Sequence, residues 1–185
     1  VGYTTGIFGK WHLGDEAEYR PESRGFDEVY IHGGGGIGQT YPGSCGDAPG
    51  NTNIDPALWH NGKFEKTKGY CTDLFFDQAI RWIDAKHTAQ QPFFAYIPLN
   101  AAHGPHVLPA EYYQQYLGKP DVTEEMAKFF GMIENVDKNF GVLLDKLKQW
   151  NLEENTLVIY LATDNGGTAG VRLFNAGMRG SKGTP

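Results

Sequence analysis

Three short apolar runs alternate along this chain with two stretches in which apolar residues recur at helical spacing. The runs cover residues 3–8, 93–99 and 156–163, and they contain many of the β-branched and aromatic residues that favour strands. A strand that is apolar on both faces needs helices on both sides of its sheet. The sequence therefore predicts an α/β fold, with a central, mostly parallel or mixed sheet and helices on both faces.

The two helical stretches are bounded by different signals. Thr72 is a suitable N-cap for a helix that ends before Gln91-Pro92. The second helix follows Pro120. Its apolar residues form a stripe that could also be a coiled-coil seam, but two glycines and the short length favour packing against a sheet. A short helix is expected near Tyr112, and Asn61-Gly62 predicts a small hairpin. The apolar positions are Phe76, Ile80 and Ile83 in the first helix, and Phe129, Ile133, Val136, Phe140, Leu143, Leu147 and Trp150 in the second.

The composition argues against two classes of partner. The 16 basic and 22 acidic residues give a formal charge of −6 and are interspersed, so the chain has no basic stripe for nucleic acid. No run approaches the roughly 18 consecutive apolar residues of a membrane span. Two cysteines, Cys45 and Cys71, are too few for a disulfide scaffold, and both a single bridge and two free thiols are open.

Residues 15–56 are polar, rich in glycine and without periodicity, which indicates a functional surface excursion. The glycine run at 33–38 formally matches a dinucleotide-binding fingerprint. Pro42 and Gly43 follow where the helix of that motif should begin, so a nucleotide-binding role is rejected.

Reactive side chains follow each of the apolar runs. Lys10 and His12 come two positions apart after the first run, His103 and His106 follow the second, and Asp164-Asn165 ends the third. Ligands of α/β folds gather at the carboxyl ends of the strands, which makes all of these side chains candidate site residues. Because Lys10 and His12 are alternate residues, we expect them to face one anion together.

Each of these groups also has a plainer interpretation. Lys10 and His12 would then be a surface lysine and a packing histidine. His106 either contacts substrate or only bonds the loop backbone, and a metal site is disfavoured because the two histidines lie in a turn with no third ligand close in sequence. Asp164 and Asn165 offer hard oxygen donors suited to calcium or magnesium, but Asp-Asn-Gly-Gly is equally good sequence for an Asx turn.

Four segments of the chain resemble, in the expected order, motifs of the sulfatase family of the alkaline phosphatase superfamily. They are Gly9-Lys10-Trp11-His12-Leu13-Gly14, His103-Gly104-Pro105, Thr163-Asp164-Asn165-Gly166 and Gly180-Ser181-Lys182-Gly183. Phe8 departs from the family, which more often has a smaller aliphatic residue there, and we expect this to affect packing only. The resemblance implies an alkaline-phosphatase-like fold in which residues 1–185 are part of one sulfatase catalytic domain.

The resemblance also implies a role for each matching side chain. Lys10, His103 and Lys182 would contact the sulfate group of a substrate. His12 would steady the nucleophile, and His106 is a candidate for a further contact on the substrate side. Such charge stabilisation would supply most of the catalysis.

Two further groups are implied by the resemblance rather than by this chain's own residues. Asp164 and Asn165 would bind Ca²⁺, with Mg²⁺ as the alternative, and more oxygen ligands would have to come from elsewhere. The nucleophile would be a formylglycine made from a Cys/Ser-x-Pro-x-Arg motif, and neither Cys45 nor Cys71 lies in such a motif. The nucleophile, the paired aspartates of the cation site and the C-terminal subdomain are therefore expected outside this chain.

The function implied is that of an arylsulfatase-like sulfuric ester hydrolase, with a small-molecule or glycan sulfate ester as substrate. The 185 residues alone are expected to be inactive. A phosphonate or phosphate monoester hydrolase of the same superfamily, and a catalytically inactive sulfate- or glycan-binding relative, are the alternatives. By resemblance the protein would be periplasmic or extracellular, or lysosomal in a eukaryote, and the absence of an Asn-x-Ser/Thr sequon slightly favours a bacterial exported enzyme.

Overall fold

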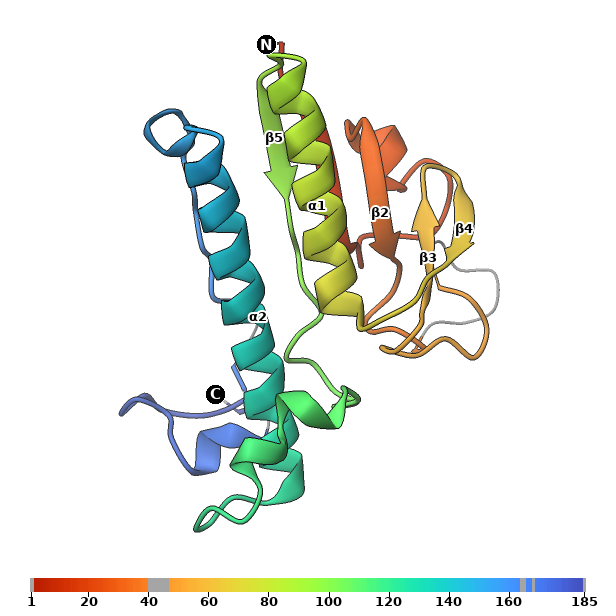
Figure 1. Cartoon of the computed structure of the whole chain (residues 1–185). Helices are drawn as coiled ribbons and strands as arrows, with labels where there is room; N and C mark the ends of the chain where they lie inside the picture. Colours follow the sequence, from red (N-terminus) through yellow and green to blue (C-terminus); the bar gives the residue numbers. More distant parts are fainter. Residues whose placement is uncertain (1, 40–46, 164–165, 168, 185) are drawn as a thin grey trace. The chain divides into compact units, whose positions relative to one another are not determined.

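The computed structural model describes residues 2–39, 47–163, 166–167 and 169–184. The chain forms two compact units, Val1–Ala101 and Ala102–Pro185 (Figure 1). None of the helices in the described residues has the length and apolar character needed to cross a membrane.

The first unit is built on a mixed five-stranded sheet with the strand order β4-β3-β2-β1-β5. Strand β1 lies between β2 and β5 and is parallel to both of them. β3 is antiparallel to β2 and forms a hairpin with β4, and its turn residues Asn61 and Gly62 have positive φ angles of 46° and 95°. The predicted mixed sheet and the predicted hairpin are both confirmed. The strands are β1 (Thr4–Lys10), β2 (Glu28–His32), β3 (Ala57–His60), β4 (Lys63–Lys66) and β5 (Phe93–Tyr96).

One face of this sheet packs against the helix α1 (Cys71–Thr88). The ring of Phe8 lies 5.6 Å from Trp82, and Tyr30 lies 6.3 Å from Phe75, measured between ring centroids. Phe8 is fully buried, so the bulky residue at this position serves packing, as we expected. Thr72 does not cap the helix, because α1 begins one residue earlier and takes Thr72 into its buried first turn.

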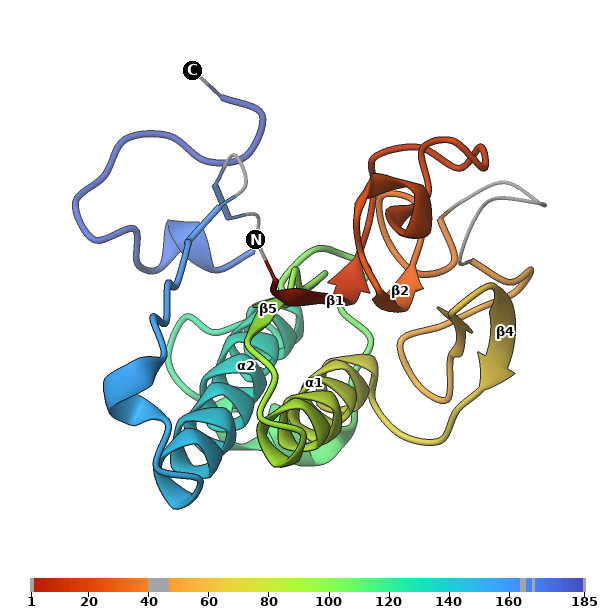
Figure 2. The same ribbon diagram turned by 90° about the horizontal axis from the view of Figure 1, so that it is seen from above.

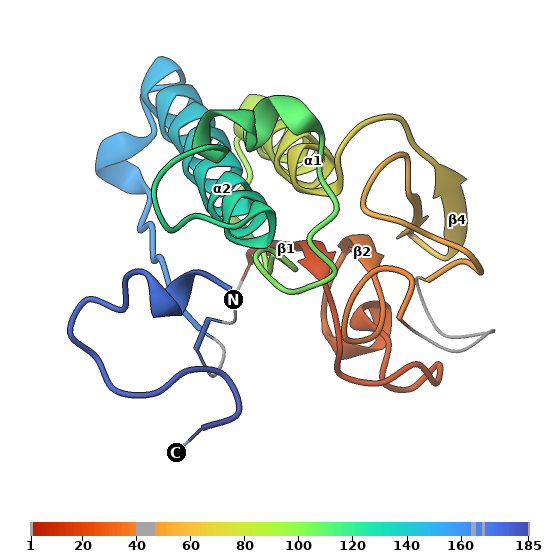
Figure 3. The same ribbon diagram turned by 90° about the horizontal axis from the view of Figure 1, so that it is seen from below.

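The opposite face of the sheet is covered by the segment that joins β1 to β2 (Figures 2 and 3). Trp11 and Phe26 from this segment pack with the apolar side chains of that face, and the Arg20 guanidinium lies 5.0 Å above the ring of Trp59. The expectation that residues 15–56 lack regular structure is wrong in part. They contain the 3-10 turn η1 (Pro21–Arg24) and strand β2, whose Val29-Tyr30-Ile31 is an apolar run too short to stand out in a polar stretch.

The second unit is built on the long helix α2 (Glu124–Gln149). Its N-terminus is capped by Thr123, whose Oγ1 accepts a hydrogen bond from the backbone N–H of Met126 at 3.2 Å. The predicted stripe is mostly buried or half-buried, but Ile133 is exposed, and the helix buries Asn135 instead. The short helix expected near Tyr112 is a pair of 3-10 turns, η2 (Ala110–Tyr112) and η3 (Gln114–Tyr116), which lie along the N-terminal half of α2 (Figure 1).

Residues 156–163 do not form the strand that their sequence predicts. They follow the short turn η4 (Glu153–Asn155) as an extended segment that pairs with no strand among the described residues. A strand is held by its ladder to a neighbour, so strand propensity alone does not make one. Leu157, Ile159 and Leu161 are consequently exposed. The only regular structure that follows in the described residues is the turn η5 (Gly170–Arg172).

Two glycines of α2 provide a matched pair for testing how this helix packs. A β-carbon at Gly131 would lie 2.7 Å from the carbonyl oxygen of Tyr112, whereas at Gly141 it would meet nothing within 4 Å. Gly131→Ala should therefore lower the free energy of unfolding by about 1–3 kcal/mol through overpacking. Gly141→Ala should raise it by about 0.5–1 kcal/mol, because alanine costs less backbone entropy in a helix. Urea titrations of both variants check this, and equal effects would contradict the packing of η2 on α2.

His60 at the end of β3 is held between two carboxylates of the first unit. Its Nε2 lies 2.9 Å from Glu28 and its Nδ1 2.9 Å from Glu65. Burial acts to lower the pKa of His60, but the two hydrogen bonds and the carboxylate charges outweigh it, so the pKa is raised above 6.5.

A raised folded-state pKa means that this stabilisation is complete at low pH and is lost as the pH rises through that value. The stability difference between the wild type and His60→Gln should therefore shrink as the pH rises above 6.5. Urea unfolding at several pH values measures it, and a difference that grows with pH would show that the imidazole is not held as a cation.

Candidate anion-binding site

Lys10 is the last residue of β1, and its position is fixed by a close backbone contact. The Lys10 N–H donates to the carbonyl oxygen of Pro98 at 2.6 Å. Gly9 has φ 144°, and a β-carbon there would lie 2.0 Å from the same oxygen. The loop that follows β5 thus closes onto the end of β1 in a way that only glycine permits.

His12 leaves the direction of the strand because it adopts a left-handed conformation, with φ 56°. The intervening Trp11 is buried on the face opposite α1, where its Nε1 donates to the carbonyl oxygen of Tyr19 at 2.9 Å. The imidazole of His12 is exposed and approaches Gly35, where a β-carbon would lie 3.5 Å from Cε1 and Nε2. The turn is therefore anchored by the buried Trp11, and Lys10 and His12 come directly before and after it in the sequence.

The glycine run at 33–38 lies beside this turn, and sequence reasoning gave it no role. Gly35 leaves room for the His12 ring, and the backbone N–H of Gly38 donates to the carboxylate of Asp47 at 3.0 Å. The signal that could have revealed this is a set of consecutive residues without a β-carbon directly after a strand. The run forms part of the surroundings of His12.

His32, the last residue of β2, is the second residue that sequence reasoning missed. Its side chain is fully buried. Burial lowers its pKa to about 4, the positive charges of Lys10 and His12 act in the same direction, and the bond to Gly33 and the charge of Asp47 oppose them. Lys10 and His12 thus lie close enough to one neutral imidazole for both charges to act on it.

The two histidines of the second unit have different surroundings. His103 is partly buried, and its Nδ1–H donates to the carbonyl oxygen of Gly104 at 2.6 Å. His106 is buried; its Nδ1 forms a short hydrogen bond with Glu125, and its Nε2 lies 3.3 Å from the carbonyl oxygen of Ala102. These contacts fasten the loop before η2 to the first turn of α2. They account for His106 as a loop residue, while contacts of either histidine with substrate stay predictions.

The Lys182 backbone lies beside Gly166 and Gly167, the two described residues that follow the predicted metal ligands in the sequence. The Lys182 N–H donates to the carbonyl oxygen of Gly167 at 3.1 Å, and a β-carbon at Gly166 would lie 3.1 Å from the same nitrogen. A hollow of about 580 Å³ opens there, lined by residues of 166–167 and 175–184. Asp164 and Asn165 are outside the described residues. Within the described residues, no group of three or more His, Cys, Asp and Glu side chains is placed to hold a metal ion.

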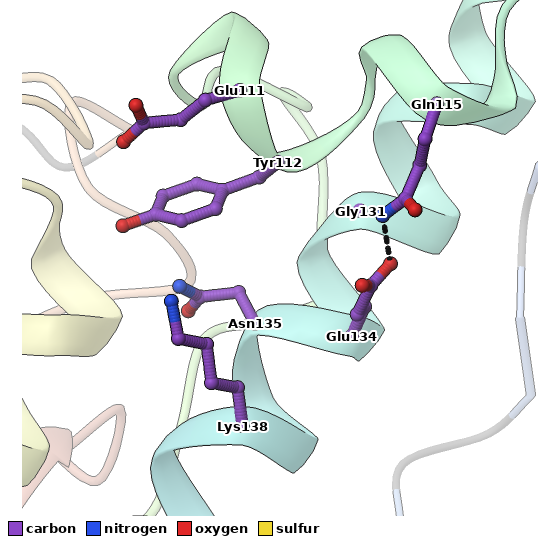
Figure 4. Close-up of a pocket in the computed structure, with 7 residues that line it drawn as sticks. All are labelled: Glu111, Tyr112, Gln115, Gly131, Glu134, Asn135 and Lys138. Atoms are coloured by element: carbon purple, nitrogen blue, oxygen red, sulfur yellow. Dashed lines mark hydrogen bonds between the residues drawn. The ribbon is translucent and has the colours of Figure 1, made fainter.

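A second hollow of the second unit, of about 360 Å³, contains none of the predicted site residues (Figure 4). Glu134 of α2 accepts hydrogen bonds there from Gln115 at 2.6 Å and from the phenol of Tyr116 at 2.5 Å. Burial, with the contact to Glu134, raises the pKa of Tyr116 to about 12, so the phenol stays a donor. These bonds hold η3 on α2 and are explained by packing. The lining residues are Glu111, Tyr112, Gln115, Gly131, Glu134, Asn135 and Lys138.

Cys71 is a free, buried thiol at the start of α1. Burial raises its pKa to about 12, and its Sγ lies 3.7 Å from the amide oxygen of Asn100. The thiol is therefore protonated at neutral pH and does not serve as a nucleophile. Cys45 is outside the described residues.

A parallel strand that ends in a glycine-framed turn with a lysine and a histidine is typical of α/β proteins that bind ligands at the carboxyl edge of the sheet. Comparison with known proteins identifies the family. The sulfatase family model matches residues 1–183. This chain belongs to the sulfatase family, and its fold is the alkaline-phosphatase-like α/β fold of that family.

Individual relatives agree with this assignment. The chain is 30% identical to arylsulfatase J of Mus musculus over 185 residues, covering 100% of this chain and 30% of the mouse protein. It is 28% identical to N-acetylgalactosamine-6-sulfatase of Rattus norvegicus, covering 90% of this chain and 31% of the rat protein. Among solved structures, Ps i-CgsB in complex with k-i-k-neocarrahexaose is similar with a TM-score of 0.69 and 32% identity, covering 84% of this chain and 36% of that chain. The chain thus spans about a third of the length of these relatives.

Proposed function

We propose that the complete protein hydrolyses sulfate esters, as an arylsulfatase-like enzyme. The observation that carries the proposal is the turn after β1. Because Gly9 has no side chain, the Pro98 carbonyl can approach and bond the end of β1. Lys10 and His12 come directly before and after the buried Trp11. Membership of the sulfatase family supports sulfate as the anion that this turn receives.

In this proposal, cationic and imidazole groups neutralise the charge of the sulfate group. Lys10, His103 and Lys182 donate to the sulfate oxygens, and His12 steadies the nucleophile, which the family resemblance locates outside this chain. Preorganised donors of this kind lower the barrier because their positions are fixed before the charge develops in the transition state. The contact between the Lys182 N–H and Gly167 supports a shared location for Lys182 and the predicted cation segment.

The cation is also a proposal. Asp164 and Asn165 would hold Ca²⁺, with Mg²⁺ as the alternative, because a carboxylate and an amide oxygen beside glycines are the hard, flexible donors that these ions prefer. Gly166 and Gly167, which follow these two residues, lie beside the Lys182 backbone. A bound divalent cation would supply positive charge to the sulfate oxygens.

The substrate we favour is a sulfated glycan. Ps i-CgsB, at 32% identity, was solved in complex with k-i-k-neocarrahexaose, and two curated relatives carry the names arylsulfatase J and N-acetylgalactosamine-6-sulfatase. His106 is the candidate for a contact on the sugar side. An exported location, in the periplasm, outside the cell or in a lysosome, accompanies this proposal.

Turnover of paired substrates tests the proposal. The complete protein, supplied with Ca²⁺, should hydrolyse an aryl sulfate at least tenfold faster than the aryl phosphonate with the same leaving group. A reversed preference would favour the phosphonate hydrolase of the same superfamily. Binding of inorganic sulfate without turnover of any ester would favour an inactive binding relative, and either result would overturn the proposal.

A further inference from the structure

His32 is a buried imidazole that the proposed chemistry has not yet used. It ends β2, and its ring stacks on Phe75 of α1 with the centroids 6.2 Å apart and the planes at 29°. Its side chain is fully buried. A polar ring in such a place requires hydrogen-bond partners or a function, because an unsatisfied buried group costs stability.

The hydrogen bond at one ring nitrogen fixes the tautomer. Nδ1 lies 2.8 Å from the carbonyl oxygen of Gly33, which can only accept, so Nδ1 carries the proton. In a neutral ring the other nitrogen, Nε2, is then an acceptor. Within the part of the chain that the structure describes, Nε2 of His32 is buried and has no hydrogen-bond partner.

The surroundings keep this ring neutral and place a cationic donor next to it. Burial lowers the pKa of His32 to about 4, which excludes the imidazolium at neutral pH. Lys10 is the register partner of His32 in the parallel ladder between β1 and β2. Register partners in neighbouring strands project from the same face of a sheet, with the strands about 4.8 Å apart. The alkyl chain of Lys10 therefore starts beside the His32 ring.

A neutral acceptor suits this position better than a carboxylate would. A buried carboxylate would form an ion pair with the ammonium and compete with an incoming anion for its charge. An imidazole nitrogen takes one N–H of the ammonium and leaves its full charge and two N–H groups for the ligand. One role explains why this acceptor is buried, why it is neutral and why it pairs in register with Lys10. That role is to hold the Lys10 ammonium.

We propose that His32 is a positioning residue: when an oxyanion is bound, its Nε2 accepts a hydrogen bond from the Lys10 ammonium and aims that ammonium at the anion. This inference rests on the proposed function, since it assigns Lys10 to the anion. His12 is the other basic side chain near the ring, but it lies beyond the strand and its imidazole approaches Gly35 instead. The residue that we expect to donate to His32 Nε2 is therefore Lys10.

Two substitutions at His32 separate the acceptor from the packing. The amide of His32→Asn can reach the position of Nδ1 and keep the bond to Gly33, but it leaves nothing at the position of Nε2. His32→Gln can place its carbonyl oxygen near the position of Nε2. In the complete protein, His32→Asn should lower kcat/KM for an aryl sulfate about tenfold to a hundredfold, the effect of losing a hydrogen bond to a charged group. His32→Gln should restore the rate to within a few-fold of wild type.

A double-mutant cycle identifies the partner and excludes a purely structural effect. In a Lys10→Ala background, His32→Asn should cause no further loss of kcat/KM, whereas in a His12→Ala background its effect should remain. Urea unfolding of each variant shows whether the fold is retained. Equal losses in His32→Asn and His32→Gln, or an undiminished loss in the Lys10→Ala background, would overturn the inference.

The inference and the proposed function can fail separately. If the wild type hydrolyses no sulfate ester, the proposed function fails, and the affinity for inorganic sulfate then tests His32. Calorimetric titration should show weaker sulfate binding in His32→Asn than in His32→Gln, with no such difference once Lys10 is alanine. The same affinity in both variants would overturn the role of His32, whatever the activity of the wild type.

Discussion

Replacing Lys10 by alanine in the complete protein should lower kcat/KM for a sulfate ester about a hundredfold. Lys10 ends strand β1, and its backbone is held by the carbonyl of Pro98 at 2.6 Å, so the point from which its side chain starts is fixed before substrate arrives. Removing a donor that is fixed in this way costs the transition state more than removing a mobile surface charge. His103→Ala should have a similar effect. Steady-state kinetics with an aryl sulfate measure both variants.

Lys68→Ala is the matched control for this experiment. Its ammonium is exposed and forms an ion pair with Asp55 at 2.8 Å, on the segment after β4, which β3 and β2 separate from β1 in the sheet. This variant has the same change in net charge and should keep the wild-type rate. A rate for Lys10→Ala within a few-fold of that of Lys68→Ala would refute the assignment of Lys10 to the sulfate group.

The largest loss of stability is expected for Gly9→Ala, at about 3–5 kcal/mol of unfolding free energy. The new β-carbon would lie 2.0 Å from the carbonyl oxygen of Pro98, and φ at this residue is 144°. β1 cannot move away easily, because it is bonded to β2 on one side and to β5 on the other. Denaturant titration monitored by tryptophan fluorescence gives the free energy of unfolding.

Gly118→Ala separates the clash from the backbone strain. Gly118 also has a positive φ, 76°, but a β-carbon there would meet nothing within 4 Å. This control should lose only about 1–2 kcal/mol, the cost of placing alanine in the left-handed region. Losses of equal size in the two variants would show that the approach of Pro98 to β1 is not tight.

Much of the fold could be predicted from local pattern. The apolar runs at 3–8 and 93–99 became neighbouring parallel strands, and Asn61-Gly62 formed the expected hairpin turn. β2 could not be found, because its three apolar residues are embedded in a polar, glycine-rich stretch. The prediction of a strand at 156–163 was wrong for the opposite reason. Its strand propensity is strong, but a strand also needs a partner strand, which the local sequence does not specify.

The candidate site residues that lie in short motifs were predictable from the sequence. Those that depend on strand register were not. Lys10, His12, His103 and Lys182 were named from motifs, and their convergence on one anion stays a prediction. His32 lies in no motif that singles it out, and its importance follows from the pairing of β1 with β2, which places it opposite Lys10. Register of this kind depends on contacts between segments distant in the sequence.

The uncovered run at 157–161 also has a consequence for how this polypeptide behaves when it is made. Leu157, Ile159 and Leu161 remain open to water in an extended stretch that contains neither charge nor proline. Such stretches add readily to one another as stacked cross-β layers. When this polypeptide is synthesised and purified, aggregation through this run should therefore compete with folding. Chaperones that bind extended apolar peptides should bind this run first.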